Sequence, residues 1–232
     1  MSPSKKLNTT KKEIILVATR FFLERGFTDT SVKLISDSLG ISTGNLTFHY
    51  PTKEHLLAVL VEMLCDFQWC SMEVALEDGS SPLMALCLEL AAMTAICEEN
   101  PIARDFYLSS YTHPMTLNII RVNDQKKAQR LFAEYCSHWD EVMFAEAETL
   151  VSGIEYTTMM NTASSPALPV RLAGALKAIL KIYGVPDEAC EDCIQKVLKM
   201  DYCGIGRTVL REFTKYVHNV SEEQLEQYLR KQ

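Results

Sequence analysis

Apolar residues recur at every third or fourth position through most of the chain, a spacing that places them on one face of a helix. In the first 64 residues, four such stripes are separated by Gly26, Gly40 and Pro51, residue types that end helices. Alternating apolar and polar positions, which predict strands, do not stand out anywhere in the sequence. The fold class is therefore predicted to be all-α. Further helices are expected over about 83–99, 102–110, 170–183 and 187–217, and a long, interrupted helical region over about 115–160.

Residues 32–50 describe two short helices joined by the tetrapeptide "LGIS". Glycine permits the tight turn of a helix-turn-helix, the following apolar residue closes a small core, and the second helix enters the major groove of DNA. Asn45 at the start of this helix can form hydrogen bonds with the edge of a base. Thr43 can form a hydrogen bond or contact a thymine methyl group. Lys53 sits at the next helix start, a natural phosphate site. The alternative is a plain helical hairpin with a polar face.

Charge is distributed unevenly between the two ends of the chain. The formal net charge is −7, which argues against a protein coated in nucleic acid. Residues 1–55, however, hold eight Lys and Arg against five Asp and Glu, so this part is basic and the remainder is strongly acidic. We expect a polyanion to dock at the N-terminal end.

The run "SVKLISDSLGISTGNLTFHYPTKEHLLAVL" resembles the DNA-binding region of the TetR family of bacterial transcriptional regulators. The segment "FFLERGFTDTS" before it and the Gly40–Ile41–Ser42 turn carry the same resemblance. It implies a helix-turn-helix domain over residues 1–51 and a helical ligand-binding and dimerisation domain over 52–232. It also implies a homodimer on a double-stranded, pseudo-palindromic DNA operator and a small-molecule inducer that releases it, so that the protein acts as a repressor.

The resemblance assigns a set of DNA-contacting positions. Two positions depart from the family pattern: Thr47 stands where tyrosine is usual, and Ser36 where alanine is common. Thr47 would then lose a stacking or phosphate contact, or replace it by a hydroxyl bond. The expected DNA-binding residues are Lys33, Ser42, Thr43, Gly44, Asn45, Thr47, Phe48, His49 and Lys53, of which Thr43 to Asn45 face the groove.

The larger domain carries no motif that names its ligand. Aromatic and polar residues within its apolar stretches are candidates for a pocket, although packing in the core or at an interface is the competing interpretation. The candidates are Arg104, Tyr107, Tyr111, His138, Trp139, Glu155 and Met159.

The family resemblance places the dimer contact in residues 168–217, with the intramolecular core as the alternative for the same faces. The second half of this region, 187–217, is expected to be one helix bent at Gly204 and Gly206. The apolar stripe of the first half consists of Leu172, Leu176, Ile179, Leu180 and Tyr183.

Cys190 and Cys193 form a lone C-x-x-C pair, which leaves a redox- or metal-sensing regulator as an alternative function. A helical enzyme or carrier with a vestigial DNA domain is a third hypothesis, although no set of nucleophile, base and orienting residue is recognisable. We expect no cofactor and no enzymatic activity. Because no apolar run reaches membrane-spanning length and the N-terminus lacks a signal sequence, we expect a cytoplasmic protein.

Overall fold

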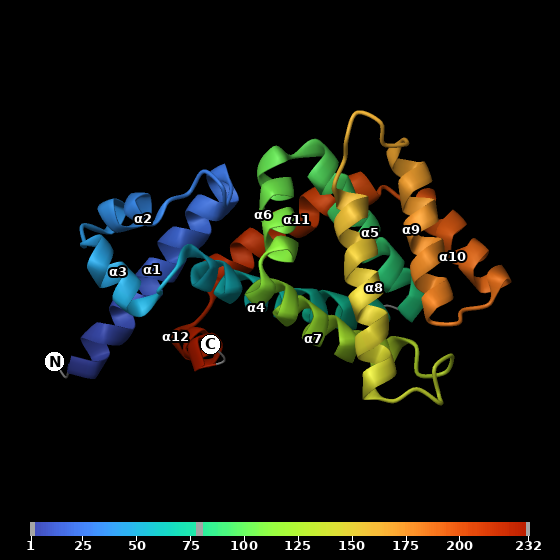
Figure 1. Cartoon of the computed structure of the whole chain (residues 1–232), viewed down its shortest axis with the longest axis horizontal. Coiled ribbons are helices and arrows are strands. Elements are labelled where there is room, and N and C mark those ends of the chain that lie inside the picture. The colour runs from blue at the N-terminus through green and yellow to red at the C-terminus, as the bar shows by residue number, and fades with distance from the viewer. Residues whose placement is uncertain (1–2, 78–80, 231–232) are drawn as a thin grey trace.

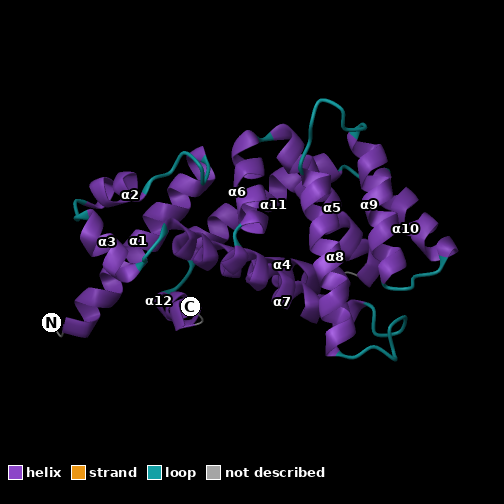
Figure 2. Cartoon of the chain, in the orientation of Figure 1, coloured by secondary structure: helices purple, strands orange, loops and turns teal. Residues whose placement is uncertain are grey.

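The computed structural model describes residues 3–77 and 81–230, and every regular element in these two ranges is a helix (Figures 1 and 2). The prediction of an all-α fold is confirmed. In chain order the helices are α1 (Pro3–Arg25), α2 (Val32–Leu39), α3 (Thr43–His49), α4 (Lys53–Glu77), α5 (Pro82–Glu99), α6 (Pro101–Thr112), α7 (Pro114–Leu131), α8 (Glu141–Met159), α9 (Leu168–Ile182), α10 (Asp187–Leu198), α11 (Tyr202–Asn219) and α12 (Glu222–Arg230).

Local capping explains the boundaries of the two short helices. The hydroxyl of Ser31 accepts a hydrogen bond from the Leu34 backbone N–H at the start of α2. Gly40 ends that helix in the left-handed conformation, with φ 65°. Ser42 caps α3 in the same way by accepting the amide of Asn45 at 3.1 Å. Two short amphipathic helices are thus joined by a tight connection, and α2 packs against both α1 and α3.

Helices α1 to α3 lie at one end of the elongated molecule, and α4 extends from them into the larger helical body (Figure 1). Helix α5 occupies the centre of that body and packs against α4, α6, α8, α9, α10 and α11. Every residue from Leu90 to Cys97 of α5 is buried, as expected for a helix enclosed by neighbours on all sides.

The expectation of one bent helix over 187–217 is wrong, because α10 and α11 are separate. Asp201 begins α11 by accepting the Gly204 amide at 2.9 Å, and the chain turns at residues 199–201 instead of bending at the glycines. Gly206 has a different role: a Cβ atom there would lie 2.6 Å from the Ala92 carbonyl oxygen, so glycine permits close packing of α11 on α5.

The apolar stripe of α9 is part of the intramolecular core. It packs against α5, α8 and α10, so this face is not open to a second chain. The opposite face keeps Val170, which is 63% exposed. The buried members of the stripe are Leu172, Leu176, Ile179, Leu180 and Tyr183, each less than 5% exposed.

Candidate nucleic-acid interface and ligand cavity

Helix α3 presents its first residues and one aromatic side chain to the solvent. Thr43, Gly44 and Asn45 are exposed, while Leu46 on the opposite face is completely buried. Phe48 is 79% exposed, and the centre of its ring lies 5.2 Å from the centre of the His49 ring in an edge-to-face arrangement. A single exposed apolar side chain is ordinary on a protein surface, so the family resemblance is what makes this ring a candidate contact for DNA.

The two departures from the family pattern have structural consequences at α3. Thr47 donates its hydroxyl to the carbonyls of Thr43 and Gly44, at 3.1 and 3.3 Å, so that donor is already used within the helix. Ser36 is fully buried, donates to the Lys33 carbonyl and lies 3.3 Å from the Thr43 hydroxyl. The serine therefore adds a polar link between α2 and α3, which sequence reasoning treated only as a mild change in packing.

Basic groups flank this surface on two sides. Lys33 is exposed and lies 3.6 Å from Asp37 one turn later, a weak pair that leaves the ammonium accessible. His49 lies near Lys11 of α1, and partial burial together with that positive charge lowers the pKa of its imidazole. The imidazole is thus predominantly neutral at pH 7 and can still donate one N–H to a phosphate.

Lys53 has an intramolecular partner that the sequence did not reveal. Its ammonium donates to the Phe27 carbonyl at 2.7 Å and lies 4.0 Å from the centre of the Phe27 ring. Burial lowers its pKa, while Glu54, Asp105 and Asp29 act in the opposite direction. The ammonium ties the start of α4 to the loop after α1, and its role as a phosphate anchor stays a prediction.

The same loop is joined to α6. Asp105 accepts hydrogen bonds from both the backbone amide and the hydroxyl of Thr28, at 2.8 and 2.5 Å. Gly26 has a φ of 93° and lies so close that a Cβ atom would be 2.6 Å from the Asp105 carboxylate. The N-terminal helices are therefore held to the body through α6 as well as through α4.

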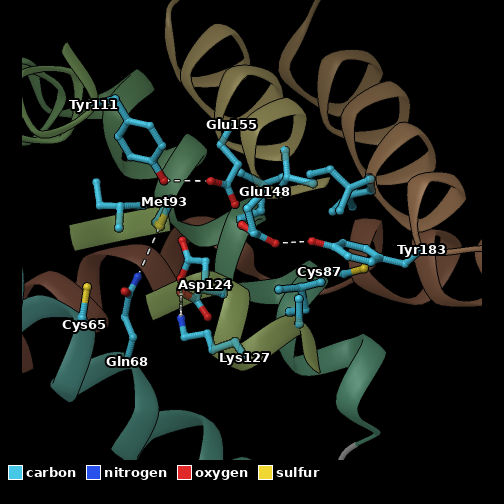
Figure 3. A pocket seen from close by; sticks show the side chains of 18 of the residues that line it. Cys65, Gln68, Cys87, Met93, Tyr111, Asp124, Lys127, Glu148, Glu155 and Tyr183 are labelled. Carbon is cyan, nitrogen blue, oxygen red and sulfur yellow. Dashed lines mark hydrogen bonds and ion pairs between the residues drawn. The ribbon is translucent and has the colours of Figure 1, made fainter. Parts of the chain in front are cut away.

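A cavity lies inside the body, lined by side chains from α4, α5, α6, α7, α8 and α9 and by Tyr183 just beyond α9 (Figure 3). The enclosed cavity is small, about 50 Å³, and the space between the lining side chains reaches about 840 Å³ only when its opening to solvent is counted. Leucine, isoleucine, valine and aromatic side chains form most of the wall. A mostly apolar cavity with a few converging polar groups is typical of a small-molecule site.

The polar groups of the cavity are mainly acidic. Lys127, 2% exposed, pairs with Glu89 at 2.9 Å and with Asp124 at 3.6 Å. Glu155 accepts the hydroxyl of Tyr111 at 2.9 Å. Glu148 accepts the hydroxyl of Tyr183 (Figure 3).

Burial dominates the protonation of these groups. It raises the pKa of Glu148 to about 8 and that of Glu155 well above its usual range. The pKa of Lys127 is also raised, because attraction to Glu89 and Asp124 outweighs the effect of burial. Burial therefore favours the protonated form of both Glu148 and Glu155 at neutral pH.

Sequence reasoning anticipated only part of this cavity. Three candidates, Tyr107, Tyr111 and Glu155, line it. Four others lie outside its lining: Arg104 and Trp139 are half-buried, His138 is exposed, and Met159 is buried elsewhere in the core. Trp139 instead packs at the rim of the core against Phe144 and Tyr183.

Several lining residues carried no usable sequence signal. The stretch containing Asp124 and Lys127 is so polar that it looks like an exposed helix face. Only its packing against α4, α6 and α8 buries Lys127 and leaves Asp124 half-buried. Glu148 was detectable in principle, because it follows Ala147 within the apolar stripe of α8.

The cysteines behave as buried apolar residues for the most part. Cys190 and Cys193 are free and buried; the first donates to the Val185 carbonyl at 3.4 Å and the second lies 3.7 Å from the Met84 sulfur. Across the described ranges, no three His, Cys, Asp or Glu side chains converge to hold a metal ion. The redox or metal hypothesis receives no support. Within the same ranges, none of the helices has both the length and the apolar character to cross a membrane.

The structure thus joins a helix-turn-helix with an exposed second helix to a helical body with an internal cavity. Residues 14–60 match the family model described as bacterial regulatory proteins, tetR family. The DNA-binding segment of the chain is therefore similar to that of the TetR family.

Two curated relatives are similar to part of the chain. The HTH-type transcriptional repressor KstR2 of Mycolicibacterium smegmatis is 31% identical over 87 residues, 37% of this chain and 42% of the relative. The HTH-type transcriptional regulator RutR of Escherichia coli K12 is 29% identical over 83 residues, 36% of this chain and 39% of the relative. The chain thus matches about two-fifths of the length of these relatives.

The likeness to a solved structure extends further along the chain. The crystal structure of RolR without ligand has a TM-score of 0.59 and covers 79% of this chain and 95% of that chain. At 18% identity it shows a shared fold that includes most of the helical body.

Proposed function

We propose that this protein is a ligand-responsive transcriptional repressor that binds a pseudo-palindromic DNA operator as a homodimer. The observation that carries the proposal is the set of exposed residues at the start of α3, Thr43 to Asn45, backed by the buried Leu46 and flanked by Lys33 and His49. In this arrangement polar groups can read bases and basic groups can meet phosphates. Double-stranded DNA in the cytoplasm is the proposed partner.

The cavity supports the ligand-responsive part of the proposal. Its wall includes Tyr107 and Tyr111 of α6, and the same helix holds the N-terminal helices through Asp105 and Thr28. It also includes Leu64 and Gln68 of α4, whose first residue Lys53 contacts Phe27. A small molecule that changes the positions of these two helices would change the placement of α3 on DNA. We propose this cavity as the inducer site.

We propose the homodimer because the DNA-binding segment is similar to that of the TetR family. The buried stripe of α9 is used within the chain, so contact through the proposed region 168–217 requires the outward faces of those helices, where Val170 is exposed. Light scattering of the purified protein tests this, and a monomer at micromolar concentration that also binds DNA as a monomer would contradict it.

The proposal is tested by selecting genomic DNA fragments with the full chain and measuring their affinities by gel shift. Asn45→Ala should relax discrimination at one base pair of each half-site, a loss of about 1–3 kcal/mol per contact. Gln195→Ala is the matched control, because it removes an exposed amide on α10, far from α3. Selection of no specific sequence, or equal binding by the Asn45 and Gln195 variants, would reject the proposed function.

The enzyme or carrier hypothesis makes a different prediction. It requires turnover or stoichiometric transport of a molecule without any effect on a DNA sequence. The relatives are named as transcriptional regulators, which favours the repressor.

A further inference from the structure

The cavity contains more acidic than basic side chains. Four of its lining residues are carboxylic acids, and within the described lining Lys127 is the only basic residue. Lys127 pairs with Glu89 and Asp124, so its single charge is divided between two acids. The remaining acids, Glu148 and Glu155, bond only to the hydroxyl groups of tyrosines in Figure 3.

Phenol donors satisfy hydrogen bonding but do not neutralise a carboxylate. An ionised acid in an apolar cavity is costly unless a positive charge lies beside it. Burial therefore favours the protonated form of both glutamates. A ligand that brings its own positive charge would remove this penalty, whereas an anionic ligand would find no unpaired positive charge among the described lining residues.

The rest of the wall suits an apolar ligand body. Leu90, Phe132 and Ile179 are among the side chains that line it. A second, largely apolar groove of about 750 Å³ empty volume adjoins this cavity, because both are lined by Gln68, Glu89, Met93 and Tyr107. The amide of Gln68 contacts the Met93 sulfur at 3.4 Å between the two spaces. An elongated ligand can therefore extend from the acids toward the groove beside α11.

We infer that the cavity binds an organic cation, an amine with an apolar body, whose ammonium group lies among Asp124, Glu148 and Glu155. The inference deepens the proposed function, since it names the chemical class of the inducer and rests on the cavity being the inducer site. The amine donates hydrogen bonds to the acids, and its single positive charge replaces one of the two protons that Glu148 and Glu155 otherwise hold.

Three probes with one skeleton separate charge from shape: 4-phenylbutylamine, 4-phenylbutanol and 4-phenylbutyrate. Titration calorimetry on the full chain without DNA measures their affinities at pH 8. The amine should bind at least tenfold more tightly than the alcohol, and the butyrate more weakly than either. Equal affinities, tighter binding of the butyrate, or no binding of the amine would overturn the inference.

Proton release gives a second readout. At pH 7 amine binding should release protons, measured as a dependence of the binding heat on the ionisation enthalpy of the buffer, and amine affinity should rise from pH 6 to pH 8. Binding of the alcohol should do neither. Amine binding without proton release would place the cation elsewhere and overturn the inference. The titratable and charged groups facing Glu148 and Glu155 are Glu89, Tyr111, Arg121, Asp124, Lys127 and Tyr183.

Matched variants locate the site. Glu148→Gln and Glu155→Gln keep side-chain size but cannot ionise, and together they should abolish the preference for the amine over the alcohol. Glu146→Gln is the control, because Glu146 lies on the same helix but is exposed. Thermal unfolding confirms that each variant is folded. A preference that survives in the double variant, or disappears in the control, would overturn the assignment.

Failure of the inference and failure of the proposed function give different results. If the amine binds but leaves DNA affinity unchanged, the cation site stands and the cavity is not the inducer site. If a neutral or anionic molecule binds in the cavity and releases the operator, while the amine does not bind, the repressor stands and the cation inference is overturned.

Discussion

At the residue scale, Thr47 stands where the TetR family usually has tyrosine, and its hydroxyl group forms hydrogen bonds within its own helix. It donates to the Thr43 and Gly44 carbonyls one turn earlier, so it does not project toward DNA as the tyrosine usual at this position would. The sequence alone left open whether the hydroxyl replaces the lost contact. The structure favours loss without replacement.

We therefore predict that Thr47→Tyr raises operator affinity roughly fivefold, about 1 kcal/mol for one added contact. Thr47→Val, which removes only the internally bonded hydroxyl, should leave affinity within about twofold. Gel-shift titration of both variants beside the unchanged protein checks this. A strong loss on Thr47→Val would mean that the hydroxyl itself contacts DNA.

Glu148 gives the second residue-scale prediction. Its pKa is about 8 in the folded protein and near 4.5 when unfolded, because burial penalises the ionised form. Between these values the folded state binds more protons than the unfolded state, so stability falls as pH rises from about 5 to 8. Glu148→Gln should remove this part of the pH dependence and stabilise the protein at pH 8 by an amount on the order of a few kcal/mol.

Urea unfolding at pH 5, 6, 7 and 8 measures that effect. Glu146→Gln is again the control, since its exposed carboxyl group should leave the profile unchanged. Parallel profiles for the Glu148 variant and the unchanged protein would show that Glu148 ionises normally in the fold.

At the element scale, α6 touches both parts of the molecule. Tyr107 and Tyr111 reach the cavity, and Asp105 on the same helix holds the loop after α1 through Thr28. Gly26 permits this approach because any side chain there would collide with Asp105. None of these contacts is visible in the sequence, where Asp105 and Thr28 are 77 residues apart.

Asp105→Ala should destabilise this junction, because the amide and hydroxyl of Thr28 lose their acceptor. We expect a loss of about 1–3 kcal/mol in the free energy of unfolding and faster hydrogen exchange in α1 to α3. Asp192→Ala is the matched control: it removes an exposed pair with Lys196 and should cost less than about 0.5 kcal/mol. Equal losses in the two variants would show that the junction does not depend on Asp105.

At the scale of the whole molecule, the net negative charge opposes DNA binding everywhere except at the basic N-terminal end. The net charge is −7 although residues 1–55 are basic, so the body should be repelled from the duplex while the α3 end is attracted. The acidic cavity is internal and does not alter this outer arrangement.

DNA affinity should therefore fall steeply as salt is added, because each neutralised phosphate releases counterions. For about six phosphate contacts per dimer, affinity should drop on the order of a thousandfold between 50 and 200 mM salt. Fluorescence anisotropy with a labelled operator measures the slope. Lys33→Ala should reduce that slope, whereas Lys199→Ala, a lysine beyond α10, should not. A slope near zero would contradict binding through phosphates.

The sequence by itself determined the all-α class, the helix-turn-helix and its capping, and the exposed residues of α3. These follow from short-range rules: the apolar spacing within a helix, the left-handed conformation of Gly40, and the serine caps Ser31 and Ser42 at the starts of α2 and α3. Only the tertiary structure decided that the α9 stripe is internal, that α10 and α11 separate, and that Asp124, Lys127 and Glu148 surround a cavity. The reason is physical: whether a polar helix face meets water or another helix depends on contacts between distant segments, which local spacing does not record.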